Sequence, residues 1–383
     1  MYDLYLNIFN KLGLPEILAQ ISWPVIPFIG VAALVVVGVI FLVLMERKVL
    51  AWLTIRKGPN RVGPFGFFQT IADAIKLLIK EDIMPSTSNK ILFTIAPIIF
   101  FAPVMVIYGL IPYTSNLFAI NVAAGLFLIL AISSLSTIGL VLAGWASNNK
   151  YSLLGGMRAA AQAISFEIPL VIAAIAIVLL AGSMNMQEIV GKQSGGAAQF
   201  ALLNWNLFSW NMWPAFIGFI VFFICSLAEL NRVPFDLPEA ESELVSGYNT
   251  EYSGMKFALF FLAEYAALLI ISILIVTLFL GGYLSPFNDY LSVILFQNLI
   301  PDAVVLSGIM ISKAQILSAF VHIEQVFWLI AKTYFLIFVI MWIRATLPRL
   351  RVDQLMGFSW KFLLPLSLVN LTIVAVYRHI FPN

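Results

Sequence analysis

Long apolar runs alternate with short polar segments along nearly the whole chain. The runs fall near residues 24–45, 91–112, 119–144, 160–181, 212–230, 256–280, 320–343 and 358–377. Each is about 20 residues long, the length of helix that crosses a hydrocarbon core about 30 Å thick. The pattern predicts an all-α polytopic membrane protein, in which eight transmembrane helices form a single transmembrane domain over residues 1–383.

The segment between the first two runs has a helical period of its own. Its apolar positions are Phe68, Ile71, Ala72, Ile75, Leu78 and Ile79. Its polar positions are Gln69, Asp73, Lys76 and Lys80. The segment is too short and too charged to span a bilayer, so we expect an amphipathic helix on the inner membrane surface. A plain connector helix is the alternative interpretation. A stiff turn rich in glycine and proline, residues 58–66, precedes it.

Lysine and arginine are concentrated in four of the polar segments. These are residues 46–90, 145–165, 228–256 and 344–361. Positive residues near the ends of membrane helices are enriched on the cytoplasmic side. We therefore expect four cytoplasmic loops, the first carrying the amphipathic helix, and both termini on the periplasmic or intermembrane side. The segments 182–211 and 281–319 are then external loops, with no part in the chemistry.

Composition narrows the chemistry that the chain can perform alone. Hydrophobic residues make up 62% of the chain and charged residues only 10%, against about 25% charged in soluble domains. The net charge of +2 gives no reason to expect nucleic acid. One cysteine, Cys225, cannot supply the four thiolates of an iron–sulfur cluster, and the two histidines, His322 and His379, have no metal-ligand spacing. We expect no metal on this chain, and any redox cofactors on partner proteins.

Carboxylates gather around the third of the predicted inner loops, residues 228–256. They are Glu229, Asp236, Glu239, Glu241, Glu243, Glu251 and, on the following run, Glu264. Pro234 and Pro238 keep the start of this segment from being helical. A solvated acidic loop is one interpretation, and ion pairs of Glu229 or Glu264 with Arg232 or Lys256 are another. The setting between two apolar runs favours a third, the handling of protons or cations.

Ionisable side chains also occur inside the apolar runs. Glu167 falls at the start of the fourth run, just before Pro169, and Lys332 and Glu324 lie two turns apart on the seventh. Such groups cost about 2.5–3.5 kcal/mol on insertion scales and are seldom without a role. Glu167 therefore joins the candidate set, whereas Lys332 and Glu324 have a structural explanation open to them as well.

Five long blocks carry a family resemblance. They are residues 46–66, 72–82, 158–170, 227–257 and 343–361, and the fourth reads LAELNRVPFDLPEAESELVSGYNTEYSGMKF. In this order they resemble the NuoH family, a family of membrane subunits of respiratory complex I, the proton-pumping NADH:quinone oxidoreductase. The mitochondrial counterpart in that family is NADH dehydrogenase subunit 1.

The resemblance implies a subunit that forms part of the quinone chamber and its entrance. The entrance would be framed by residues 24–45, 64–80 and 255–280. Its chamber and entrance residues would be Arg47, Arg56, Arg61, Asp73 and Phe235. A proton relay that couples quinone reduction to proton translocation would comprise Glu167, Glu229, Asp236, Glu239, Glu241, Glu243, Glu251 and Glu264.

The resemblance also implies how the work is divided among subunits. Quinone, ubiquinone or menaquinone, would be a substrate, with nothing bound covalently. NADH, FMN and the iron–sulfur clusters would belong to soluble partners on the cytoplasmic side. Small membrane subunits and antiporter-like subunits would be further neighbours. The chain would thus be an enzyme only as a subunit, with no complete active site and no catalytic residue of its own.

Other functions stay open at this point. The chain could be the equivalent subunit of a ferredoxin- or F420-linked complex or of a membrane hydrogenase. A stand-alone proton or cation transporter would use the same carboxylates, but such transporters carry internal repeats, and the acidic segment has no copy in the first half of the chain. A passive membrane anchor would leave Glu167, Glu229 and Glu264 without a reason. We expect the bacterial inner membrane, with the mitochondrial inner membrane as the alternative.

Overall fold

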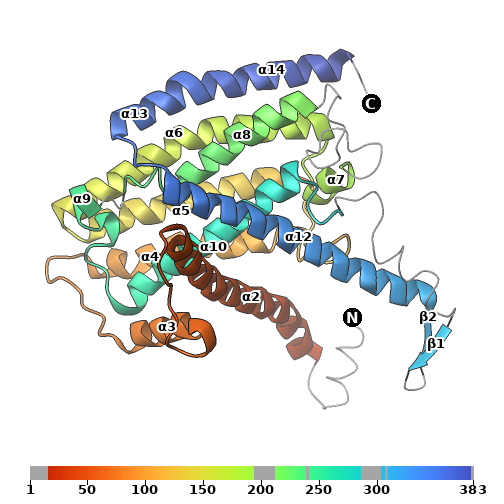
Figure 1. Ribbon diagram of the computed structural model, residues 1–383, viewed down its shortest axis with the longest axis horizontal. Coiled ribbons are helices and arrows are strands. Elements are labelled where there is room, and N and C mark those ends of the chain that lie inside the picture. Colours follow the sequence, from red (N-terminus) through yellow and green to blue (C-terminus); the bar gives the residue numbers. More distant parts are fainter. Residues whose placement is uncertain (1–15, 194–211, 239–240, 286–302, 307–308, 381–383) are drawn as a thin grey trace.

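A computed structural model describes residues 16–193, 212–238, 241–285, 303–306 and 309–380 (Figure 1). Before the acidic segment its elements are α2 (Glu16–Leu53), η1 (Pro64–Gly66), α3 (Gln69–Ile79), α4 (Lys90–Tyr108), α5 (Gly125–Ala146), α6 (Lys150–Ala181), α7 (Met186–Gly191) and α8 (Met212–Glu229). After it follow α9 (Glu241–Leu244), η3 (Gly247–Asn249), α10 (Gly254–Phe279), β1 (Ala303–Leu306), β2 (Ile309–Ser312), α12 (Lys313–Thr346), α13 (Val352–Phe358), the π-helical turn η4 (Ser359–Leu363) and α14 (Leu364–Ile380).

The helical fold is as predicted, with one addition. β1 and β2 form an antiparallel pair in which Ala303 is opposite Ser312 and Leu306 is opposite Ile309. This pair lies in the segment 281–319, which we expected to be a plain external loop. The apolar β-branched residues on either side of the Ser-Gly sequence at positions 307 and 308 favour such a pairing.

Seven helices within the described residues are long and apolar enough to cross a membrane. They correspond to the predicted runs except the fifth. That run forms α8, an apolar helix of 18 residues, of which the described side chains cover only the shorter stretch Ala215–Glu229. The polytopic character of the chain is thus confirmed, and the count of eight spans stays a prediction.

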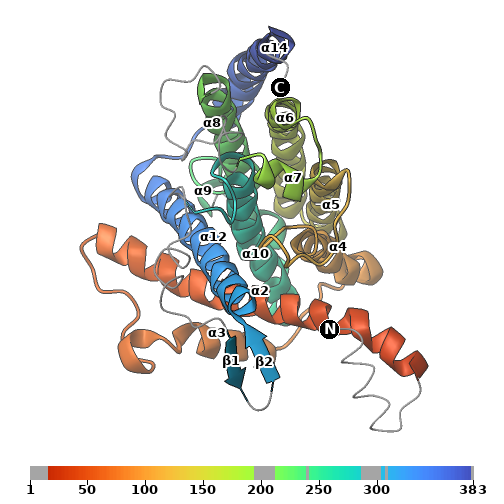
Figure 2. The ribbon, with the colours of Figure 1, turned by 90° about the vertical axis from the view of Figure 1, so that its right-hand side faces the viewer.

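α10 lies at the centre of the helix assembly. Its apolar stretch is 72% buried, whereas the other six spans range from 28% to 50%. Figure 2 shows α10 with α12 on one side, α4 and α5 on the other, and α2 crossing it. Helices with apolar side chains on every face are expected in such a position, and the buried residues of α10 do face all round it.

α6 and η4 fit together at a proline. Pro169 lies inside α6, and because proline has no N–H, the carbonyl of Ser165 has no helical donor. The Ser359 hydroxyl in η4 donates to that carbonyl at 2.6 Å, and the Trp360 indole N–H donates to the Ser165 hydroxyl at 3.3 Å. The π-helical turn thus satisfies a backbone group that the proline leaves free.

The four predicted inner segments meet at one end of the molecule. The contacts that join them are Asn89 N–H to Ala146 O at 3.2 Å and Leu350 N–H to Pro234 O at 3.1 Å, Ile83 N–H to Ser253 Oγ at 2.9 Å, and Lys256 Nζ to Asp82 at 2.9 Å. At the other end the predicted external segments 182–211 and 281–319 meet, because the Gly281 N–H donates to Gln193 Oε1 at 2.8 Å. The chain therefore alternates between two ends as the charge pattern predicts; which end faces the cytoplasm stays a prediction.

The second inner segment differs from the expected loop over residues 145–165. α6 already begins at Lys150, so only residues 147–149 connect it to α5. The Asn149 side chain caps the new helix by accepting from the Tyr151 N–H at 3.0 Å. The polar and glycine residues of this stretch hid the helix from an analysis based on hydropathy.

Candidate functional site

An apolar pocket of about 540 Å³ opens between α2, α3 and α10. Val39 and Val43 of α2, Leu77 of α3 and Phe261 and Leu262 of α10 are among the side chains that line it. The same three helices were predicted to frame an entrance. The wall is mostly apolar but also includes Arg47, Thr70, Asp73 and Lys76, a combination that suits an amphiphilic ligand.

The polar end of the pocket is an ion pair. Arg47 at the end of α2 and Asp73 on α3 both line the pocket, and their side chains meet at 2.5 Å. Gln69 also donates to Asp73 at 3.3 Å. The Arg47 and Asp73 side chains retain 41% and 27% of their exposure, so solvent or a ligand can still reach them.

The turn between α2 and α3 folds back so that α3 can lie beside α2. Lys48 on α2 donates from Nζ to the carbonyl of Phe65 at 2.7 Å. Gly66 has φ +75°, and a Cβ there would come within 2.2 Å of the Pro59 carbonyl oxygen. Only glycine tolerates both the backbone angle and the close approach. This turn therefore determines where Asp73 lies.

Three predicted chamber residues lie away from the pocket wall. Arg56 and Arg61 are exposed on the turn, and Arg56 Nε donates to the Thr54 hydroxyl at 3.2 Å. Phe235 is 5% exposed and its ring lies 5.6 Å from that of Phe166. The structure thus brings together Arg47 and Asp73 among the five residues predicted for the chamber and entrance.

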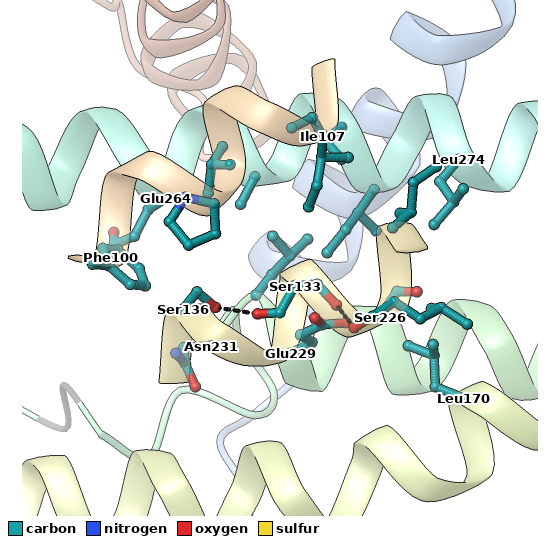
Figure 3. Close-up of a pocket in the computed structure, with 18 of the residues that line it drawn as sticks. Phe100, Ile107, Ser133, Ser136, Leu170, Ser226, Glu229, Asn231, Glu264 and Leu274 are labelled. Atoms are coloured by element: carbon teal, nitrogen blue, oxygen red, sulfur yellow. Dashed lines mark hydrogen bonds between the residues drawn. The ribbon is translucent and has the colours of Figure 1, made fainter. Parts of the chain in front are cut away.

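A second, smaller cavity of about 60 Å³ lies among α4, α5, α6, α8 and α10 (Figure 3). Its wall includes two carboxylates, Glu229 at the end of α8 and Glu264 on α10. The polar residues beside them are Ser133, Ser136, Ser226 and Asn231, and the rest of the wall is apolar. Two acids predicted on separate runs therefore share one cavity.

Both carboxylates of the cavity have polar neighbours. The Tyr248 hydroxyl donates to Glu264 Oε1 at 2.5 Å, and the Tyr248 side chain is fully buried. Glu229 interacts with the Ser133 side chain and with the charge of Glu167. Of the predicted relay residues, Glu229 and Glu264 share this cavity, and Glu167 is close enough for its charge to act on Glu229. We call these three residues the carboxylate cluster.

The other predicted relay acids lie around this cluster with partners of their own. These pairs are Asp236 with Arg349 at 2.9 Å, Glu243 with Arg158 at 2.6 Å, and Glu251 with the Asn149 amide at 2.6 Å. Glu239 lies outside the described residues, and Glu241 is described only as the first residue of α9. Most of the acidic loop is therefore tied to inner-end partners.

The basic residues considered as partners of Glu229 and Glu264 are engaged elsewhere. Lys256 pairs with Asp82 at 2.9 Å. Arg232 pairs with Glu46 at 2.7 Å and lies over the Tyr265 ring, 4.5 Å from its centroid. These contacts weigh against the ion-pair interpretation of the carboxylate cluster.

Glu46 is a residue that the sequence analysis did not select. It is 2% exposed and pairs with both Arg232 and Arg344. This triad joins α2, the segment after α8 and the end of α12. The available signal was a glutamate directly after the apolar run 24–45, but because Arg47 and Lys48 follow it, Glu46 was assigned to the first inner loop.

Lys332 has a structural role at the opposite end. Its ammonium donates to the carbonyls of Leu280, Gly282 and Leu284 at 2.8, 3.1 and 2.6 Å. Three carbonyl acceptors use all three ammonium hydrogens. Lys332 thus closes the C-terminal end of α10.

Within the described residues, no three His, Cys, Asp or Glu side chains are grouped as a metal centre requires. The arrangement instead offers an apolar pocket next to a carboxylate cluster inside a helix assembly. The fold and the site together define a multi-pass membrane protein with half-buried acids inside its helix assembly.

A family model described as NADH dehydrogenase matches residues 26–375. The chain therefore belongs to the NADH dehydrogenase family, as the five blocks predicted, and is a membrane subunit of the complex I type. Membership also implies that other subunits of an oxidoreductase complex surround it.

Proposed function

We propose that this subunit admits quinone from the bilayer and couples its reduction to proton translocation in NADH:quinone oxidoreductase. The pocket between α2, α3 and α10 would be the passage for quinone. An isoprenoid tail needs an apolar path. The apolar side chains of the pocket wall, such as Val39, Leu77 and Leu262, offer one. The headgroup would meet the Arg47–Asp73 pair, whose charges can bind carbonyl or hydroxyl oxygen.

The observation that carries the proposal is the position of α10 between the two cavities. Its first turns, from Met255 to Leu262, line the apolar pocket. Its following turns, from Glu264 to Leu274, line the carboxylate cavity. A quinone in the passage would therefore lie one helix away from the carboxylate cluster.

The carboxylate cluster would hold and release protons in response to events in the passage. Reduction of a quinone by two electrons also consumes two protons, and movement of the product alters the local field. Because charges in a low-dielectric interior interact strongly, such a change would redistribute protons among Glu167, Glu229 and Glu264. The new protonation state of the cluster would then act on the neighbouring antiporter-like subunits.

The chemistry of electron transfer would lie on partner subunits. NADH, FMN and the iron–sulfur clusters would be bound there, together with the residues that protonate the quinone directly. This chain would contribute the passage, its polar end and the cluster. The bacterial inner membrane is the proposed location.

The test is Glu229→Gln in the intact complex, reconstituted into liposomes. Glutamine keeps the size of the side chain but cannot exchange the proton, so proton transport per NADH, or the quinone reductase rate itself, should fall several-fold. Glu188→Gln is the matched control, because Glu188 is exposed on α7 at the opposite end. Wild-type rate and pumping in the assembled Glu229→Gln complex would falsify the proposal.

A further inference from the structure

Ser226 is a buried hydroxyl that lacks a partner. It lies on α8 one turn before Glu229, is 1% exposed, and its Oγ makes no hydrogen bond within the described structure. Buried polar atoms are normally hydrogen-bonded to protein or to ordered water. Ser226 lines the same cavity as Glu229 and Glu264, so the missing partner should be sought there.

The cavity is large enough for ordered water. It measures about 60 Å³, while one water needs about 10–15 Å³ measured in this way. A buried water also needs two to four polar partners. The wall supplies more than that number, since two carboxylates, three serines and Asn231 are part of it.

The α5 serines present acceptors to this space. Ser133 donates its hydroxyl hydrogen to the Leu130 carbonyl at 2.9 Å, and Ser136 donates to the Ser133 carbonyl at 2.7 Å. Each serine oxygen keeps lone pairs that can accept from water. In Figure 3 these serines lie on α5, between α10 with Glu264 and α8 with Glu229. Ser226, whose hydrogen is uncommitted, can donate as well as accept.

We propose that Ser226 holds an ordered water in this cavity, with Ser133 and Ser136 as further ligands, and that this water carries protons between Glu229 and Glu264. In the transfer, one carboxylic acid gives its proton to the water as the water gives another proton to the second carboxylate. Charge moves from one acid to the other and the water is regenerated. Ser226 is a positioning residue in this step, and the step rests on the proposed function.

The test compares Ser226→Ala with Ser226→Thr in the intact complex. Alanine removes the water ligand, so proton transport per NADH should fall several-fold, while threonine keeps the hydroxyl and should keep most of the transport. Ser134→Ala is the matched control, because Ser134 lies on α5 next to Ser133 but is absent from the cavity wall, and donates to Ala131 O at 2.9 Å.

Two readouts separate this role from mere packing. A high-resolution cryo-EM map of the wild-type complex should show density within hydrogen-bond distance of Ser226 Oγ, absent in Ser226→Ala. The infrared carbonyl band of the protonated acid at Glu229, identified with Glu229→Gln, should shift in Ser226→Ala and not in Ser134→Ala. A packing defect without water would change neither readout in this selective way.

The outcomes distinguish this inference from the proposed function. Loss of pumping in Glu229→Gln together with wild-type pumping in Ser226→Ala overturns the water relay alone. Wild-type pumping in both variants overturns the proposed function with it. An empty cavity in a well-resolved map of the wild-type complex also overturns the relay.

Discussion

The buried Glu46 side chain holds together three segments that are far apart in the sequence. One carboxylate oxygen accepts from both Arg232 and Arg344, and the other oxygen, Oε2, is buried without a partner in the described structure. Breaking a buried ion pair by removing one member is costly because it leaves a charge without compensation. The triad therefore holds α2, the segment after α8 and α12 in one arrangement.

At the residue scale we predict that Glu46→Gln destabilises the protein. Loss of the negative charge leaves two arginines close together and poorly compensated, so the expected loss of stability is about 3–5 kcal/mol. The measurement is a thermal-shift assay of the purified complex, supported by the yield of assembled complex.

Asp353→Asn is the control for this variant, because Asp353 is an exposed acid in the first turn of α13. It should unfold at the wild-type temperature. Equal melting temperatures for Glu46→Gln and wild type would show that the triad has no stabilising role.

The contacts of individual side chains are the feature that the sequence predicts least well. Glu229 and Glu264 were selected from their places at or inside apolar runs, yet their common cavity depends on the packing of five helices. Asp236 and Glu243 were selected for the same reason and instead pair with Arg349 and Arg158. Charge density along the chain cannot distinguish these cases, because the partners come from distant segments.

At the element scale, the three-helix frame of the apolar pocket offers a direct test. Ala258 on α10 lines the pocket, and phenylalanine there would fill part of it. We predict that Ala258→Phe lowers the rate with long-tailed quinones much more than the rate with a short-tailed analogue. The physical reason is that, in the proposed function, only the long tail would have to occupy the apolar pocket. The measurement is the quinone reductase rate of the complex with each substrate in liposomes.

Ala131→Phe is the comparison, since Ala131 is exposed on α5 and absent from the pocket wall. This variant should keep the wild-type ratio of the two rates. The prediction is wrong if Ala258→Phe lowers the rates with both quinones by the same factor, because the effect would then not depend on the length of the tail.

The elements themselves were largely predictable. The eight apolar runs and the amphipathic segment around Asp73 all form helices in the described part of the chain, because hydropathy and helical period act locally. The start of α6 was missed because it depends on the Asn149 cap and on packing against α5. The fit of Ser359 to the carbonyl freed by Pro169 joins residues far apart in sequence, and no local pattern indicates it.

At the scale of the whole molecule, the two ends of the helix assembly differ in charge and in contacts. If the end that gathers the acidic loop faces the cytoplasm, residue Ala119, exposed in the segment between α4 and α5, faces the periplasm. Cys225, the one cysteine in the sequence, is fully buried, so an introduced cysteine can be labelled against a low background.

We therefore predict that Ala119→Cys reacts with a membrane-impermeant maleimide in right-side-out vesicles and is protected in inverted ones. Mass spectrometry of the chain measures the labelling, and wild-type protein reports any reaction of Cys225. Labelling only in inverted vesicles would reverse the orientation deduced from the lysines and arginines.

α10 has a thermodynamic consequence for the molecule as a whole. The helix is a common wall of the apolar pocket and of the carboxylate cavity. A ligand in the pocket that favours one position of α10 would therefore also affect the protonation of the acids in the cavity. Such coupling is reciprocal in free energy. If an occupant of the pocket makes the cluster bind protons more tightly, then protonation of the cluster must tighten the occupant by the same factor. If quinone is that occupant, as proposed, its affinity should depend on pH although the cluster acids are not part of the pocket wall.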